Sequence, residues 1–382
     1  MLVPASRSRS APAVSASSDA VGPARHEWVD VAKGVCIALV VLLHASNFLI
    51  GRGMAHPLWN DINALVQPIR MPLFFLASGL FLAKTLTMPW AQVLRRRVLP
   101  LLYLYVVWTF VRWAYFTLFP ATAGTAEPGS IWKPIRALVI PDSGLWFIYA
   151  LAVFAFVARA LVRIPAVLQL VAAFGSAVAV PHLDFGSWTW HNMATLLVFY
   201  LLGVHAARHA HRIAAAATPA RVAAAVLAFA CAFALVRDGA LAQSSLAHVA
   251  TSTVGLVTGI AVAALLARHR VAAPFRRLGT RTLAVFLLHE IAFGTALALL
   301  LAAGLEPTVM QRIPVTPLLV AAFAIVVSLW GRSAFERIGL GVLFTMPPRL
   351  PDAPAATGRA LRRVWAARGA AAPASRRETR EA

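Results

Sequence analysis

The sequence predicts an all-α polytopic membrane protein, a bundle of about ten transmembrane helices. Of its 382 residues, 60% are hydrophobic and 13% are charged, a more apolar balance than soluble domains have. Apolar runs long enough to cross a bilayer as helices also recur along the chain. We expect spans at residues 30–50, 64–84, 98–119, 144–162, 165–181, 193–208, 220–237, 250–268, 281–303 and 315–333.

The distribution of arginine predicts how the chain is organised around this bundle. Residues 1–25 are rich in Ser, Ala and Pro and are expected to be disordered, 26–346 form the membrane domain, and 347–382 form a basic, disordered tail. With the amino end inside, the inner connections are at least as basic as their outer neighbours, as for Arg95–Arg97. We therefore expect both termini in the cytoplasm and the helices in the inner (plasma) membrane.

The formal net charge of +21 narrows the possible partners. In a soluble protein it would suggest nucleic acid, but arginines placed between apolar spans suit anionic membrane lipids better, so no nucleic-acid partner is expected. Cys36 and Cys231 both lie in apolar runs and are interpreted as small hydrophobic residues. No spacing typical of a zinc, haem or phosphate-loop site occurs, so neither a metal nor a permanently bound cofactor is expected.

The first span, DVAKGVCIALVVLLHAS, carries polar residues that a lipid-facing helix does not need. Lys33 and His44 are eleven residues apart, which places them within about 20° of each other on a helix. Asp30 can pair with Lys33, and Asn47 continues the same stripe. Such a stripe should face the bundle interior, where a neutral His44 imidazole can accept a proton. The alternative is a histidine that only packs against a neighbouring helix.

The second span, QPIRMPLFFLASGLFLAK, brings a second charge into the membrane. If this span is the antiparallel neighbour of the first, Arg70 lies at the level of His44. Its guanidinium can then anchor an oxyanion or the acceptor, and the alternative is an arginine that snorkels to the interface. Small residues at Ser78 and Gly79 allow close helix approach, and Ser78 is also a candidate substrate contact.

Together these segments resemble the acyltransferase 3 family of integral-membrane O-acyltransferases. DVAKGVCIALVVLLH is similar to the family's first helix, in the branch with Lys-Gly where Arg is usual, and MPLFFLASGLF is similar to its second. RRRVLPLLYLYVVW, LWFIYAL and LGTRTLAVFLLH follow in the family's order, up to His289. The resemblance implies transfer of an acyl group, often acetyl, from cytoplasmic acyl-CoA to a hydroxyl, usually on envelope carbohydrates or glycolipids. It also implies that His44 is catalytic.

Acyl transfer to an alcohol assigns further roles. His44 serves as the base or as a transient acyl carrier, which the sequence does not separate. Lys33, held by Asp30, is a candidate for the donor tunnel, and Arg95, Arg96 and Arg97 are candidates for the phosphates of acyl-CoA, with topology anchoring as the alternative. The remaining candidate substrate contacts are Asn47, Ser78, Asp142, Trp146, His289 and Glu290. For His289–Glu290 a buried structural pair, and for Asp142 a solvated loop carboxylate, are the alternatives.

Another class of protein also fits the polar stripe. A proton-coupled transporter or permease could use Asp30, Lys33 and His44 as its path. A transporter would move its substrate without acyl-CoA, so acyl transfer in isolated membranes separates the two hypotheses. The acceptor, the length of the acyl chain and the oligomeric state are left open by the sequence.

Overall fold

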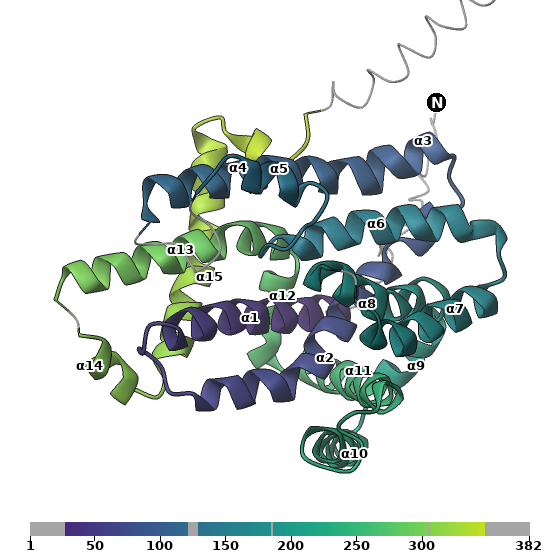
Figure 1. Cartoon of the computed structure of the whole chain (residues 1–382). Helices are drawn as coiled ribbons and strands as arrows, with labels where there is room; N and C mark the ends of the chain where they lie inside the picture. Colours follow the sequence, from purple (N-terminus) through teal and green to yellow (C-terminus); the bar gives the residue numbers. More distant parts are fainter. Residues whose placement is uncertain (1–26, 121–128, 185, 305, 348–382) are drawn as a thin grey trace, which may run out of the picture.

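The structure, a computed structural model, describes residues 27–120, 129–184, 186–304 and 306–347. In these ranges the chain is helical and has no strand, which confirms the predicted all-α class. Helices α1, α4, α6 and α13 lie roughly parallel or antiparallel, α15 crosses them at a steep angle, and α4 and α10 lie at opposite edges of the bundle (Figure 1). The predicted terminal segments, 1–25 and 347–382, lie outside the described residues except for residue 347. The α-helices are α1 (Glu27–Ile50), α2 (Leu58–Leu80), α3 (Trp90–Val93), α4 (Leu99–Leu118), α5 (Trp132–Ala137), α6 (Trp146–Ala160), α7 (Ala166–Ala179), α8 (Trp188–His205), α9 (Ala207–Ala215), α10 (Pro219–Arg237), α11 (Ser245–Ala267), α12 (Ala273–Gly279), α13 (Thr282–Ala302), α14 (Pro307–Arg312) and α15 (Thr316–Arg337).

Each of the ten predicted spans coincides with one of these helices, although α2 begins at Leu58 rather than residue 64. Eight described helices are long and apolar enough to cross a membrane, and α8 with α9 makes a ninth if this pair, bent by 79°, is one span. The apolar helical segment Ala166–His182, which includes α7, is shorter. The chain is thus a polytopic membrane protein with eight or nine clear spans in its described part, rather than ten.

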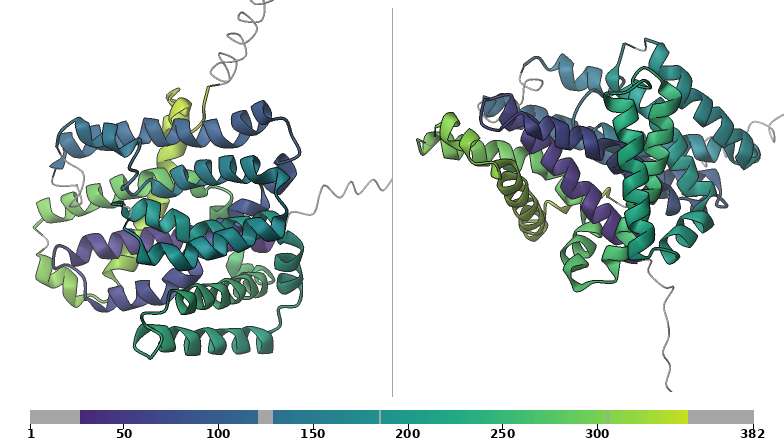
Figure 2. Two further views of the ribbon diagram at one scale, coloured as in Figure 1. Left: turned by 45° about the vertical axis from the view of Figure 1, so that its right-hand side comes forward. Right: turned by 90° about the horizontal axis from the view of Figure 1, so that it is seen from below.

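Helix α1 lies inside the bundle and contacts α2, α11, α12, α13 and α15; two further views are given in Figure 2. Its first half approaches α12 closely enough that a Cβ at Gly34 would overlap the backbone carbonyl of Phe275. A Cβ at Gly279 would likewise overlap the carbonyl of Asp30. The glycine of the Lys33–Gly34 pair therefore serves helix packing, because only a residue without a side chain allows this contact.

Helices α2 and α8 make a second close crossing through Gly79 and Gly203. A Cβ at Gly79 would overlap the Tyr200 carbonyl and lie 3.1 Å from the Cα of Gly203. Neighbouring Ser78 donates its hydroxyl to the Phe74 carbonyl of the same helix, at 2.9 Å. Gly79 thus has the packing role that its sequence context indicates.

The two phenylalanines of the FF pattern fix α6 against α2. The Phe74 ring stacks on Phe147 with centroids 4.5 Å apart, and Phe75 packs on Phe147 at 4.8 Å and on Phe154 at 5.1 Å. Aromatic contacts of this kind add to the burial of the rings themselves. They hold α6, which begins at Trp146, beside the C-terminal part of α2.

The glycine crossing predicts a position-specific cost. We expect Gly79→Ala to destabilise the protein by about 1–3 kcal/mol, because its Cβ meets backbone that cannot move without separating α2 from α8. Gly175→Ala in α7 is the matched control: its Cβ would have no neighbour within 4 Å, and removing a helical glycine should stabilise by about 0.5–1 kcal/mol. Thermal unfolding in detergent measures both, and equal effects would contradict the packing role.

Candidate active site

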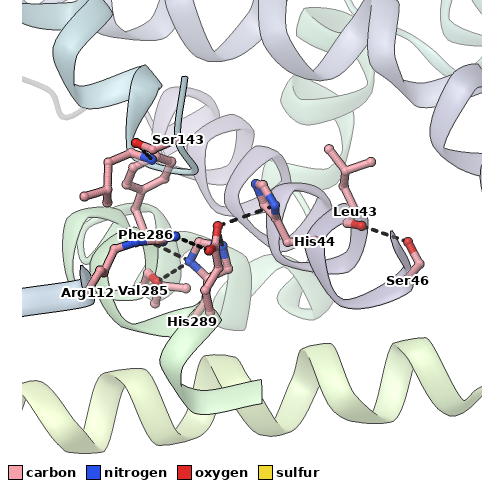
Figure 3. Close-up of polar contacts among 10 residues, drawn as sticks. Leu43, His44, Ser46, Arg112, Ser143, Val285, Phe286 and His289 are labelled. Atoms are coloured by element: carbon pink, nitrogen blue, oxygen red, sulfur yellow. Dashed lines mark hydrogen bonds and ion pairs between the residues drawn. The ribbon is translucent and has the colours of Figure 1, made fainter. Parts of the chain in front are cut away.

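Side chains from three helices meet around the carboxylate of Glu290 on α13. The Arg112 guanidinium of α4 forms an ion pair with it, Nη2 to Oε2, at 2.5 Å. On the other oxygen, Oε1, the carboxylate faces Nδ1 of His44 on α1 at 3.5 Å (Figure 3). Gly144, just before α6, packs so closely that a Cβ there would overlap this carboxylate. The carboxylate is therefore held between an arginine and a histidine.

His289, the residue before Glu290, belongs to the same cluster, and its hydrogen bonds show which ring nitrogen carries the proton. Its Nδ1 lies 3.0 Å from the Val285 carbonyl and 2.9 Å from the Phe286 carbonyl. Carbonyls only accept hydrogen bonds, so Nδ1 carries the proton and, in the neutral ring, Nε2 is an acceptor. Nε2 is buried without a hydrogen-bond partner and lies 3.9 Å from Glu290 Oε1, and the His44 and His289 rings are 5.2 Å apart.

His44, His289 and Glu290 also present the kinds of donor atoms that divalent zinc binds. One ligand atom from each lies within 4.8 Å of the others. However, Arg112 already places a full positive charge against the carboxylate, and like charges at this distance repel strongly in a low-dielectric setting. The set is therefore better suited to orienting His44 than to holding a cation.

The C-terminal half of α1 borders a cavity of about 700 Å³. Predicted residues that line it are His44, Asn47, Arg70 and Trp146. Because Nδ1 of His44 faces Glu290, Nε2 is the nitrogen that remains for a ligand in this cavity. Residues that the sequence analysis did not single out also line it: Trp188, His191, Asn192, Arg237 and His248.

The cavity and the cluster together have the features of a general-base site. An imidazole on the cavity wall is oriented by a carboxylate, which is itself fixed by a guanidinium. This is the arrangement in which a base accepts a proton and a carboxylate stabilises the resulting imidazolium. The 3.5 Å separation is longer than a strong hydrogen bond, as is common before a substrate is bound.

Other predicted site residues lie elsewhere. Lys33 is not among the residues that line the cavity; its Nζ lies over the Phe81 ring, 5.1 Å from the centroid. Arg97 contacts the same residue, donating from Nη2 to the Phe81 carbonyl at 2.9 Å and from Nε to Thr85 at 3.1 Å. Arg95 and Arg96 lie in the same short π-helix, Leu94–Val98. The predicted residues therefore divide into a cavity group and a basic group, with Lys33 and His44 about 16 Å apart along α1.

Asp142 and Ser78 have structural contacts of their own, outside the cavity. Ser187 Oγ donates to Asp142 Oδ1 at 2.7 Å and the Thr189 amide donates at 2.9 Å, which ties the loop before α6 to the beginning of α8. Partial burial raises the pKa of Asp142, but these hydrogen bonds outweigh it and hold the pKa below its ordinary value. Asp30 is buried, and its backbone carbonyl lies against Gly279. Its pairing with Lys33 stays a prediction.

Arg112 is the functional residue that the sequence analysis missed. It lies in the third apolar span, in the segment FVRWAYF, and its side chain is only 2% exposed. The general rule that an ionisable residue inside a span faces the bundle interior would have singled it out. Its pairing with Glu290 depends on two helices far apart in sequence, and no spacing rule reveals that.

The ion pair predicts a large stability difference between two arginine substitutions. Arg112→Met should destabilise the protein by about 3–5 kcal/mol, because Glu290 is left as an unpaired buried charge. Adding Glu290→Gln to this variant should recover much of the loss, since no charge then remains buried. Arg332→Met is the matched control, because it breaks the exposed Arg332–Glu336 pair at 2.8 Å and should change stability by less than about 1 kcal/mol.

Thermal unfolding of the four proteins measures these effects. An Arg112→Met variant as stable as Arg332→Met would show that the ion pair is not the constraint inferred here.

Comparison with known proteins identifies the family of the chain. The family described as Acyltransferase domain (Acyl_transf_3) matches residues 26–333, which include the cluster and the cavity. The inner membrane protein YcfT of Escherichia coli (strain K12) is 25% identical over 197 residues, 46% of this chain and 55% of that protein, so the match spans about half of the relative. No solved structure matches the chain. With a family match over most of its length and a bundle of membrane-spanning helices, the chain belongs to the acyltransferase 3 family and is a multi-pass membrane protein.

Proposed function

We propose that the protein transfers an acyl group, in the simplest case acetyl, from cytoplasmic acyl-CoA to a hydroxyl of an envelope carbohydrate, glycolipid or related small acceptor. His44 is the base in this proposal. The observation that carries it is the position of His44, on the wall of a 700 Å³ cavity with Glu290 behind its Nδ1. The sequence left open whether His44 is a base or an acyl carrier, and a carboxylate behind the ring favours the base.

The reaction then follows from the positions of these groups. Nε2 of His44 accepts the proton of the acceptor hydroxyl as its oxygen attacks the thioester carbonyl, and Glu290 stabilises the imidazolium. This attack forms the new C–O bond of a tetrahedral intermediate, which then collapses: its oxyanion re-forms the carbonyl and the C–S bond breaks, leaving the ester. The imidazolium returns the proton to the leaving thiolate, so the histidine ends the cycle neutral. Arg112 takes no part in proton transfer and keeps the carboxylate ionised and in place.

The basic group at the other end of α1 supports entry of the donor from the cytoplasm. Lys33 and Arg97 lie around Phe81, and Arg95 and Arg96 precede Arg97 in sequence. Arg276 pairs with Glu27 at 3.1 Å where α1 begins. Arginine is well suited to phosphate, and a concentration of arginine at this end suits a cytoplasmic face. In this orientation both termini are cytoplasmic and the bundle lies in the inner membrane. An acyl-CoA whose phosphates lie near Lys33 must then extend about 16 Å along α1 to bring its thioester to His44.

Replacing the proposed base tests the function directly. We expect His44→Ala to lose transfer of radiolabel from [¹⁴C]acetyl-CoA in isolated membranes while the protein still folds and inserts, because His44 is the histidine among the described cavity residues whose ring faces a carboxylate. His269→Ala, an exposed histidine outside the cavity, is the matched control and should retain wild-type transfer.

Two outcomes would contradict the proposal. Full transfer by His44→Ala would exclude His44 as the base. Uptake of an acceptor by wild-type vesicles without any acyl-CoA requirement would instead favour the transporter hypothesis. Mass spectrometry of envelope glycans and lipids from cells with and without the gene would then identify the acceptor as the molecule that lacks an acyl mass.

A further inference from the structure

Arg70 of α2 carries a buried charge that the proposed reaction does not use. Its side chain is 3% exposed, and it lines the cavity beside His44. We propose that this cavity binds an acceptor that carries an anionic group, a carboxylate or a phosphate, and that Arg70 holds this group. The inference rests on the proposed function for the role of the ligand as acceptor.

The hydrogen bonds of Arg70 leave most of its guanidinium unused. Nη1 donates to the Leu39 carbonyl of α1 at 3.4 Å, a long contact, and the buried Nε has no hydrogen-bond partner. No carboxylate of the described residues forms an ion pair with it. The Cys36 thiol lies near, but an uncharged thiol is only a weak hydrogen-bond partner. A buried cation without a counter-ion is costly, and a ligand anion would remove that cost.

The other arginines near the site form ion pairs with carboxylates. Arg70 and Arg112 are the two arginines of the described chain that are buried, and Arg112 is paired with Glu290. Arg237, at the cavity wall, pairs with Asp61 at 2.6 Å and Asp238 at 3.5 Å. Arg70 thus differs from both, because it is buried, lines the cavity and forms no ion pair with a carboxylate of the described residues.

The rest of the cavity wall also suits a negative ligand. Its titratable residues are Arg70, Arg237, His44, His191 and His248, and no aspartate or glutamate is among the described residues that line it. The carboxylate of Glu290 lies behind His44 and is neutralised by Arg112. An anionic ligand therefore meets no negatively charged side chain among the described residues of the wall. Asn192, Thr195 and Ser252 can form hydrogen bonds with its hydroxyls.

Two other uses of Arg70 predict different behaviour. If Arg70 bound the phosphates of acyl-CoA, it would belong with the basic group around Phe81, but it lies in the other group, with His44 and Trp146. If Arg70 acted only on the oxyanion of the intermediate, ground-state ligands with and without an anionic group would bind equally well. Ligand binding without any reaction therefore separates these possibilities.

The experiment measures the Tm of the full-length protein in neutral-lipid nanodiscs without acyl-CoA. The soluble probes, at matched ionic strength, are glycerol, glycerate and glycerol 3-phosphate, which differ in the anionic group. Nanodiscs with added phosphatidylglycerol test the same chemistry on a lipid, and CoA tests the donor phosphates. A ligand that binds only the folded protein raises its Tm, so we expect a rise with an anionic alcohol or with phosphatidylglycerol, and none with glycerol.

Substitutions then assign the effect to Arg70. Arg70→Met should abolish the anion-dependent rise and, without ligand, should melt no lower than wild type, because it removes an unpaired buried charge. Arg70→Lys should keep part of the rise, and the exposed Arg312→Gln, which lies outside the cavity, should keep all of it.

Three results would overturn the inference. These are a rise that persists in Arg70→Met, an Arg70-dependent rise with CoA alone, and a strongly destabilised ligand-free Arg70→Met, which would make Arg70 a structural residue. Because no acyl donor is needed, anion binding can hold while acyl transfer fails, and the reverse, so the two proposals are tested separately.

Discussion

The ion pair between Arg112 and Glu290 is the interaction on which the rest of the site depends. Two opposite charges are buried inside a membrane bundle, where either one alone would be severely destabilising. Satisfying both requires α4 and α13 to lie at a fixed separation, and the free oxygen of the carboxylate then faces His44 on α1. The same constraint that stabilises the bundle thus orients the proposed base.

Helix packing places this cluster beside a cavity rather than beside lipid. Glycine contacts bring α1 against α12 and α2 against α8, and stacked phenylalanines bring α6 against α2. Trp146 at the start of α6 then meets Trp188 at the start of α8, with ring centroids 5.5 Å apart, and both border the cavity. The basic group around Phe81 lies near Lys33, about 16 Å from His44 along α1. In the proposed function, this arrangement separates the site of the charged donor from that of the acceptor.

The fold was largely predictable from hydrophobicity, because each apolar run of spanning length is a helix. The polar face of α1 was partly predictable as well: helical periodicity places His44 and Asn47 at the cavity, whereas Lys33, on the same stripe, lies at the basic end because the cavity does not extend that far. Arg112 and its pairing with Glu290 were not predicted, since they depend on contacts between segments about 180 residues apart. The hydrogen bonds that tie Asp142 to Ser187 and Thr189 at the beginning of α8 could be found only from the tertiary structure, and its contact with substrate stays a prediction.

The role of Glu290 behind His44 is tested most directly by the steady-state kinetics of Glu290→Gln with purified protein and [¹⁴C]acetyl-CoA. An amide can still orient the imidazole but cannot stabilise its positive charge. The account predicts a kcat lower by about 10²–10⁴-fold, the range associated with general-base catalysis, with little change in the KM for acetyl-CoA. An unchanged kcat in a folded Glu290→Gln protein would contradict it.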